Sequence, residues 1–98
     1  MDNKSEIIEI IYQSIDEINR EEKLDIHKDI LTKLFGRGSS LDSLGLVNLI
    51  VSVEEKINIK FGVAISLVDE KAMSQKSSPF LNIESLTNYI LLLLIEVI

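Results

Sequence analysis

The run from Ser43 to Ile57 constrains the fold most, because its apolar residues repeat at helical spacing on two sides of one helix. At about 100° per residue, five of them share one broad arc, which is the expected core face of an amphipathic helix. They are Leu46, Leu49, Ile50, Val53 and Ile57. The opposite side carries a thin apolar stripe with polar and acidic neighbours: Leu44, Val47 and Val51, with Asn48, Glu54 and Glu55 beside them. Such a stripe either packs beneath another helix or binds a partner, and the periodicity leaves both interpretations open.

Asp42 precedes this run and is a good N-cap, because a carboxylate accepts hydrogen bonds from the free N–H groups of a first helical turn. Ser43 then occupies the first helical position and is expected to point outward. The positive end of the helix dipole favours a phosphate there, so Ser43 is well placed to carry a phosphate ester. As a bare tripeptide, however, Asp-Ser-Leu is typical of any helix start.

Size and charge limit the classes of function. The chain has 98 residues, of which 46% are hydrophobic, and this predicts one domain over residues 1–98 with a single core. The 16 acidic and 10 basic residues give a net charge of −6, which disfavours nucleic acid and anionic membranes and favours a basic protein surface as partner. The chain has no cysteine, which excludes disulfides and thiolate chemistry and suits a cytoplasmic location.

The sequence indicates neither a membrane segment nor a catalytic centre. The longest apolar run, Tyr89 to Ile95, is shorter than the about 20 residues that span a bilayer, and no signal peptide is expected at the N-terminus. His27 is the single histidine and lies among scattered acids, which is a poor arrangement for a metal ion. No serine stands at a recognisable catalytic spacing from it, so we expect neither a metal site nor an enzyme.

Two further helices are expected from the same periodicity. One covers roughly Ser5 to Arg20 and turns isoleucines toward the core: Ile7, Ile8, Ile11, Ile15 and Ile18. The other begins at Ile83 behind an Asn82 cap and has a larger core face: Leu86, Tyr89, Ile90, Leu93, Leu94 and Val97. Three more residues make this last helix apolar nearly all round: Leu91, Leu92 and Ile95. It is therefore either buried against the first helix or available for self-association with a second copy.

Shorter elements connect these helices. An apolar cluster within a long first loop predicts a single helical turn: Ile30, Leu31, Leu34 and Phe35. Residues 61–65 are expected to be extended, and a short helix is expected within Ser66 to Met73. The sequence therefore predicts an all-α fold, a small four-helix bundle with three main helices, one short helix and a long first loop.

Several short motifs follow one another in a familiar order. They are Leu34-Phe35-Gly36, then Leu41-Asp42-Ser43-Leu44, then Val47, Leu49 and Glu54-Glu55, and finally Phe80-Leu81-Asn82-Ile83-Glu84-Ser85-Leu86. In a small acidic chain with the serine near its middle, these motifs resemble the acyl carrier protein family. The resemblance covers nearly the whole chain.

The resemblance implies a carrier rather than an enzyme. In the family, the serine of the Asp-Ser-Leu motif receives 4′-phosphopantetheine from coenzyme A through a separate phosphopantetheinyl transferase, and that serine matches Ser43. The thiol of this arm holds acyl groups as thioesters for acyl-transferring and acyl-modifying enzymes of fatty-acid, polyketide or related lipid biosynthesis. The family's partner-docking surface on the second helix maps to seven residues: Asp42, Leu44, Val47, Asn48, Val51, Glu54 and Glu55.

Two positions depart from the family pattern. Many fatty-acid-synthesis carriers have an acid where this chain has Gly45, and a glutamate at the position of Asn48. The second helix is therefore less acidic, which predicts a specialised rather than a housekeeping carrier whose docking depends less on salt.

Three alternatives remain beside the acyl carrier. A close variant loads an amino or hydroxy acid, as aminoacyl and peptidyl carriers do. A small helical adaptor would bind a partner through Leu44, Val47 and Val51 without a prosthetic group. An enzyme acting through Ser43 has the least support, because the sequence supplies no base or oxyanion arrangement.

Overall fold

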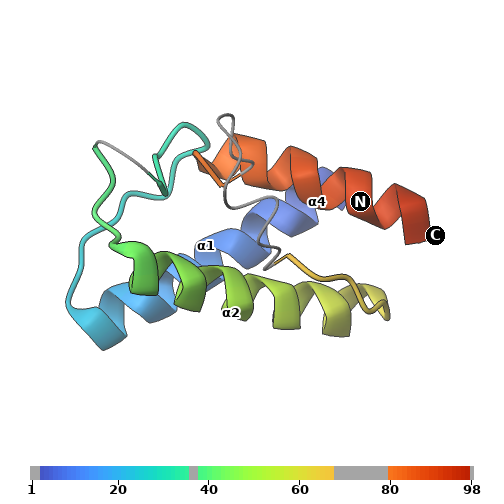
Figure 1. Ribbon diagram of the computed structural model, residues 1–98, viewed down its shortest axis with the longest axis horizontal. Coiled ribbons are helices and arrows are strands. Elements are labelled where there is room, and N and C mark those ends of the chain that lie inside the picture. Colours follow the sequence, from blue (N-terminus) through green and yellow to red (C-terminus); the bar gives the residue numbers. More distant parts are fainter. Residues whose placement is uncertain (1–2, 36–37, 68–79, 98) are drawn as a thin grey trace.

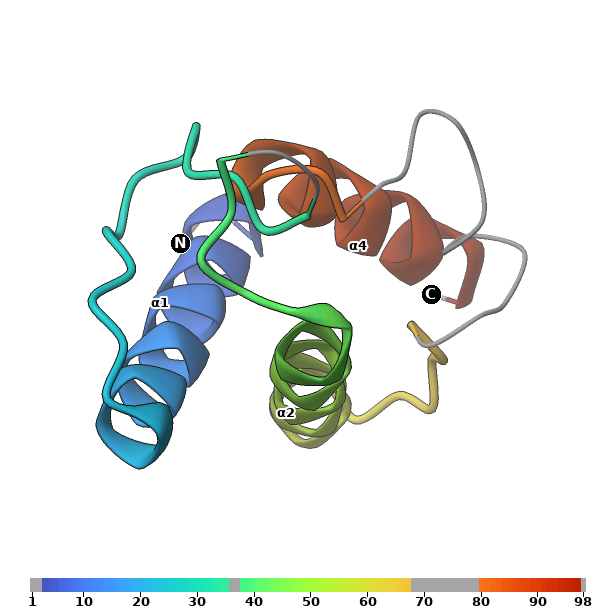
Figure 2. The same cartoon turned by 60° about the vertical axis from the view of Figure 1, so that its left-hand side comes forward.

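The structure, a computed structural model, describes residues 3–35, 38–67 and 80–97, which form three helices. These are α1 (Asn3–Glu22), α2 (Ser43–Phe61) and α4 (Ile83–Val97). Helix α1 packs against both α2 and α4 (Figure 1). Figure 2 shows α2 nearly end-on, with α1 beside it and α4 above. The described part of the chain contains no strand, so the all-α class is confirmed, with α1 as the helix that the other two share.

The core is formed by the predicted faces of α1 and α2. Helix α1 buries most of its predicted isoleucines together with Ile10, whereas Ile8 is half-buried and not a core residue. The five predicted core residues of α2 are all buried, each with at most 1% of its surface exposed. A helix that is apolar on two sides has therefore turned its broader side toward α1, as expected for the face that buries more apolar area.

Helix α4 is buried only along part of its apolar circumference. Of the predicted face, Leu86, Ile90 and Leu94 are buried, but Tyr89 and Leu93 are half-buried. Val97 was also predicted to be a core residue, and this is wrong: it is exposed, because the C-terminal end of α4 projects beyond the other two helices (Figure 1). Two residues on the outer side of α4 are also exposed: Leu92 and Ile95. Self-association through this helix stays a prediction.

Helix α1 ends in a hydrogen-bonded clasp. Lys23 follows the helix in the left-handed conformation, with φ 54°, and the Leu24 N–H donates to the Asn19 carbonyl at 3.0 Å. The Asn19 side chain then binds both backbone groups of Ile26: its Oδ1 accepts from the Ile26 N–H at 2.9 Å, and its Nδ2 donates to the Ile26 carbonyl at 3.1 Å. The clasp thus satisfies polar groups at the helix end and places Ile26 in the core.

Helix α2 ends in a second clasp of the same kind, in which Asn58 binds the backbone of the residue seven positions later, Ile65. Gly62 is left-handed with φ 63°, and the Val63 N–H donates to the Asn58 carbonyl at 3.2 Å. The Asn58 side chain accepts from the Ile65 N–H at 2.9 Å and donates to the Ile65 carbonyl at 3.1 Å. The two helix ends therefore share one pattern. Each has an asparagine, a left-handed residue four positions later and a buried isoleucine seven positions later.

The chain between α1 and α2 pairs with the start of α4. The Leu34 N–H donates to the Leu81 carbonyl at 2.8 Å. In return, the Ile83 N–H donates to the Thr32 carbonyl at 3.2 Å, and the Glu84 N–H donates to the Ile30 carbonyl at 2.8 Å. Such bonds satisfy N–H groups that a helix start leaves open. A reciprocal cap completes the α4 start: the Asn82 Oδ1 accepts from the Ser85 N–H at 2.7 Å, and the Ser85 Oγ accepts from the Asn82 N–H at 3.1 Å.

This pairing corrects the interpretation of the apolar cluster in the first loop. The segment forms a turn and an isolated bridge at Lys33 rather than a helical turn. Only Leu34 of the four apolar residues is buried, while the others are exposed: Ile30, Leu31 and Phe35. The short helix expected within Ser66 to Met73 lies mostly outside the described residues, and Ser66 and Leu67 are not helical. The four-helix count therefore stays a prediction.

A polar network crosses the interface between α1 and α2. The Lys56 Nζ lies 2.8 Å from the Glu17 Oε1 and donates to the Ser52 Oγ at 2.8 Å. The Ser52 hydroxyl in turn donates to the Glu17 Oε1 at 3.3 Å. The hydrogen bond from Lys56, with its positive charge, holds the pKa of Glu17 below its usual value of 4.5 despite partial burial.

Lys23 and Gly62 provide a matched test of the two helix exits. Lys23→Gly should raise the free energy of unfolding by roughly 0.5 kcal/mol, because relief of left-handed strain, about 1–2 kcal/mol, outweighs the added entropy of an unfolded glycine, about 0.5–1 kcal/mol. Gly62→Ala should lower it by about 1 kcal/mol through backbone strain alone, since no heavy atom lies within 4 Å of the added Cβ. Urea denaturation measures both, and a Gly62→Ala variant as stable as the wild type would contradict this assignment.

The lowered pKa of Glu17 predicts how its stabilising effect depends on pH. Because the folded pKa lies below the unfolded value of 4.5, the effect is fully present above 4.5 and is lost as pH falls through the lower folded value. The Glu17 side chain is 40% exposed, so Glu17→Gln should cost less than about 1 kcal/mol at pH 7. Urea denaturation from pH 7 to well below 4.5 should show the difference from wild type shrinking, and a constant difference would argue against an electrostatic origin.

Candidate functional site

Helix α2 begins at a cap formed by Asp42. The backbone of Asp42 is extended, with φ −84° and ψ −178°, and the Asp42 Oδ1 accepts a hydrogen bond from the Gly45 N–H at 2.7 Å. Its carbonyl accepts the first helical bond, from the Leu46 N–H at 2.9 Å. The predicted N-cap role of Asp42 is confirmed, and the cap sets the position of every residue in the first turn.

Ser43 is the first residue of α2 and is exposed. Its hydroxyl makes no side-chain hydrogen bond within the described part of the chain. The free N–H groups and the dipole of α2 make this place favourable for a bound phosphate. Ser43 is therefore an exposed hydroxyl-bearing residue at the positive end of α2.

The apolar stripe on the outer side of α2 is open to solvent at its start. Leu44 is 68% exposed and Val51 is 37% exposed, whereas Val47 between them is half-buried. Apolar side chains left in water next to a modifiable residue fit a surface that a partner covers. Periodicity left two interpretations open for this stripe: packing beneath another helix, or binding a partner. At Leu44 the structure does not have the first arrangement, because this side chain is exposed.

The polar residues of the predicted docking surface differ in what they do. Asn48 and Glu55 are exposed. Glu54 is half-buried, and its Oε2 accepts a hydrogen bond from the Leu67 N–H at 2.6 Å. With the Asn58 clasp, Glu54 therefore holds residues 65–67 against α2. Sequence reasoning assigned Glu54 to a partner and missed this bond, because a backbone N–H at a distant position leaves no pattern in the sequence.

Gly45 is buried against the cap, where space for a side chain is tight. A Cβ at this position would lie 3.1 Å from the Asp42 Oδ1 and 3.2 Å from the Leu41 Cδ2, and 3.7 Å from the Glu22 Oε2 of α1. A side chain would therefore push the capping carboxylate and Leu41 slightly aside. A hollow of about 150 Å³ lies in this region, lined by six residues: Glu22, Leu24, Ser40, Leu41, Asp42 and Gly45.

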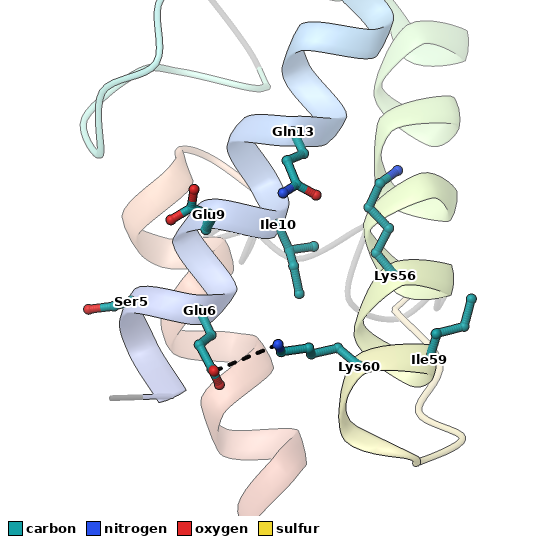
Figure 3. A pocket seen from close by; sticks show the side chains of 8 residues that line it. All are labelled: Ser5, Glu6, Glu9, Ile10, Gln13, Lys56, Ile59 and Lys60. Carbon is teal, nitrogen blue, oxygen red and sulfur yellow. Dashed lines mark ion pairs between the residues drawn. The ribbon is translucent and has the colours of Figure 1, made fainter. Parts of the chain in front are cut away.

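A larger groove, of about 460 Å³, lies at the other end of α2. Figure 3 shows Ile10 pointing from α1 toward α2, with Ile59 on the far side and Glu6 pointing toward Lys60, at 3.8 Å. Ile59 is sixteen residues after Ser43, which corresponds to about 24 Å along the helix axis. The groove is therefore separate from the start of α2, and none of the predicted site residues lines it.

Neither a metal site nor a membrane-spanning helix is found among the described residues. No three His, Cys, Asp or Glu side chains among them gather in a way that could hold a metal ion. None of the helices in those ranges combines the length and apolarity needed to cross a bilayer. His27 is exposed, in agreement with its interpretation as a loop or surface residue.

Comparisons with protein-family models, with curated proteins and with solved structures found no match for this chain. The start of α2 and the resemblance of the surrounding motifs are therefore the features that bear on function.

The cap can be tested without reference to function. Asp42→Ala should lower the free energy of unfolding by about 1 kcal/mol, because the Gly45 N–H loses its acceptor. Asp42→Asn keeps an acceptor and should cost much less. Chemical denaturation with helix content followed by circular dichroism measures both variants. Equal losses for alanine and asparagine would show that the charge of Asp42, and not the hydrogen bond, carries the effect.

Proposed function

We propose that the protein is a carrier that holds acyl groups as thioesters on a 4′-phosphopantetheine arm attached to Ser43. One observation carries the proposal: an exposed serine at a capped helix start, next to an exposed apolar stripe that begins at Leu44. The resemblance of the surrounding motifs to acyl carrier proteins supplies the identity of the arm. The bound arm would supply the reactive thiol, and the chain itself would supply the attachment point and the docking surface.

The residues at the start of α2 fit such an attachment. The Asp42 cap fixes the backbone of the first turn, including the position of Ser43. A phosphopantetheinyl transferase would form the bond between the Ser43 Oγ and phosphorus while the pyrophosphate bond of coenzyme A breaks. Adenosine 3′,5′-bisphosphate would leave, and a base of the transferase would take the hydroxyl proton. This division of labour agrees with an exposed serine that makes no side-chain hydrogen bond among the described residues.

The partners follow from the same surface. Leu44, Val47 and Val51 supply apolar contacts, and Asn48 and Glu55 supply a polar rim with a single negative charge. Because Glu54 is bound to the Leu67 N–H, fewer free carboxylates remain on α2 than the sequence indicates, which supports the proposal of a specialised carrier. We place it with acyl-transferring or acyl-modifying enzymes of fatty-acid, polyketide or related lipid biosynthesis in the cytoplasm. Loading of an amino or hydroxy acid is the close variant.

A small helical adaptor is the second candidate, and the exposure of Leu44 favours it equally. An adaptor would use the apolar stripe to bind a partner and would leave Ser43 unmodified. The two candidates therefore differ at one atom, the Ser43 Oγ.

Intact-mass measurement separates the two candidates. Incubation with coenzyme A and a broad-specificity phosphopantetheinyl transferase should add one phosphopantetheine to the wild type and none to Ser43→Ala. Ser66→Ala is the matched control, because Ser66 is also exposed but lies outside the helices, and it should be modified like the wild type. A folded wild-type protein that gains no mass would support the adaptor instead.

A further inference from the structure

We propose that the enzyme that modifies Ser43 inserts a basic side chain into the hollow between the end of α1 and the start of α2. The inference rests on the proposed function and specifies which contact positions the modifying enzyme on the start of α2. It assigns Glu22, at the last position of α1, as a partner-binding residue.

The hollow is shaped and charged for a single cationic side chain. Its volume is about 150 Å³, and its lining includes two carboxylates, Glu22 and Asp42, but no lysine or arginine. Leu24 and Leu41 provide apolar walls, which suit the aliphatic part of a lysine or arginine side chain. Gly45 contributes no side chain, so the space stays open beside the two carboxylates. A cation entering here would meet both negative charges at once.

Glu22 occupies a position that helix physics disfavours. It is the final residue of α1, after Glu21, and both are exposed. The C-terminal end of a helix carries partial negative charge, so an acid there costs stability, typically about 0.3–1 kcal/mol. The Glu22 Oε2 nevertheless lies 3.7 Å from where a Cβ of Gly45 would be, close to the α2 cap. A glutamate that is unfavourable at its own helix end but lies close to the residue to be modified fits a binding role.

The other acids near Ser43 are less available to a partner. Glu54 is occupied by the Leu67 N–H, and Glu55 lies twelve residues after Ser43, which is about 18 Å along α2. The hollow, in contrast, includes the residues on either side of Ser43 and Leu44, namely Asp42 and Gly45. Asp42 lines the hollow and directly precedes Ser43, so an enzyme bound over the start of α2 lies next to it. A basic group is the complementary partner chemistry, in keeping with the net charge of −6.

The kinetics of phosphopantetheine transfer test the inference. The full chain is incubated with coenzyme A and a broad-specificity phosphopantetheinyl transferase, and intact-mass time courses at several carrier concentrations give KM and kcat. Glu22→Gln should lower kcat/KM by about two- to fivefold, the size expected for one exposed ion pair. Glu22→Lys should lower it by about tenfold or more, because it places like charges opposite one another. Both effects should appear mainly in KM and should shrink as salt is raised.

Two controls separate binding from folding and from net charge. Glu96→Gln and Glu96→Lys make the same charge changes at an exposed residue near the end of α4, and both should leave the rate unchanged. Thermal unfolding should show Glu22→Lys to be at least as stable as the wild type, because a lysine is favourable at a helix C-terminus. A variant that is more stable but more slowly modified is a result that a purely structural role of Glu22 would not produce.

The outcomes distinguish the inference from the function on which it rests. Modification of Glu22→Lys at the wild-type rate would overturn the inference and leave the carrier function intact. An equal loss in the Glu96→Lys control would also overturn it, because the effect would then reflect net charge. Failure of the wild type itself to gain phosphopantetheine would overturn the carrier function first.

Discussion

The hydrogen bond from the Gly45 N–H to the Asp42 Oδ1 is the contact on which the candidate site depends. At 2.7 Å it closes the first turn of α2 and fixes where the helix begins. Because the helix begins there, Ser43 is exposed at its positive end and Leu44 points to solvent. The same bond holds the capping oxygen close to Gly45, since a Cβ at this position would lie 3.1 Å from it. One interaction thus determines the exposed serine, the start of the apolar stripe and the open space beside them.

Helix α1 supplies the support for this arrangement. It packs against both other helices, and its isoleucines bury the broad face of α2, so the narrow face is the one left in water. The clasps at Asn19 and Asn58 then direct the chain away from each helix and return an isoleucine to the core. The C-terminal ends of α1 and α2 are therefore satisfied by hydrogen bonds within the chain, whereas the start of α2 leaves Ser43 and Leu44 exposed.

The parts of the fold that local rules govern could be predicted from the sequence. The Asp42 and Asn82 caps and the two faces of α2 follow from spacing within a few residues, and the structure agrees with them. The bond from Leu67 to Glu54 and the pairing of Leu34 with Leu81 were not predicted, because backbone groups far apart in the sequence form them. The exposure of Ile30 and Leu31 was missed for the same reason: a backbone pairing, and not their own hydrophobicity, decides which side of the segment is buried.

The position of charge around Ser43 also depends on tertiary structure. Along the sequence, the acids near Ser43 belong to the second helix and its cap: Asp42, Glu54 and Glu55. In the fold, Glu54 binds the Leu67 N–H, whereas Glu22 of α1 lies close to the start of α2. A carboxylate can thus be lost from a surface by an internal hydrogen bond and replaced by one from another helix. Under the proposed carrier function, partner choice would depend on how α1 and α2 pack, because the apolar stripe belongs to one helix and Glu22 belongs to the other.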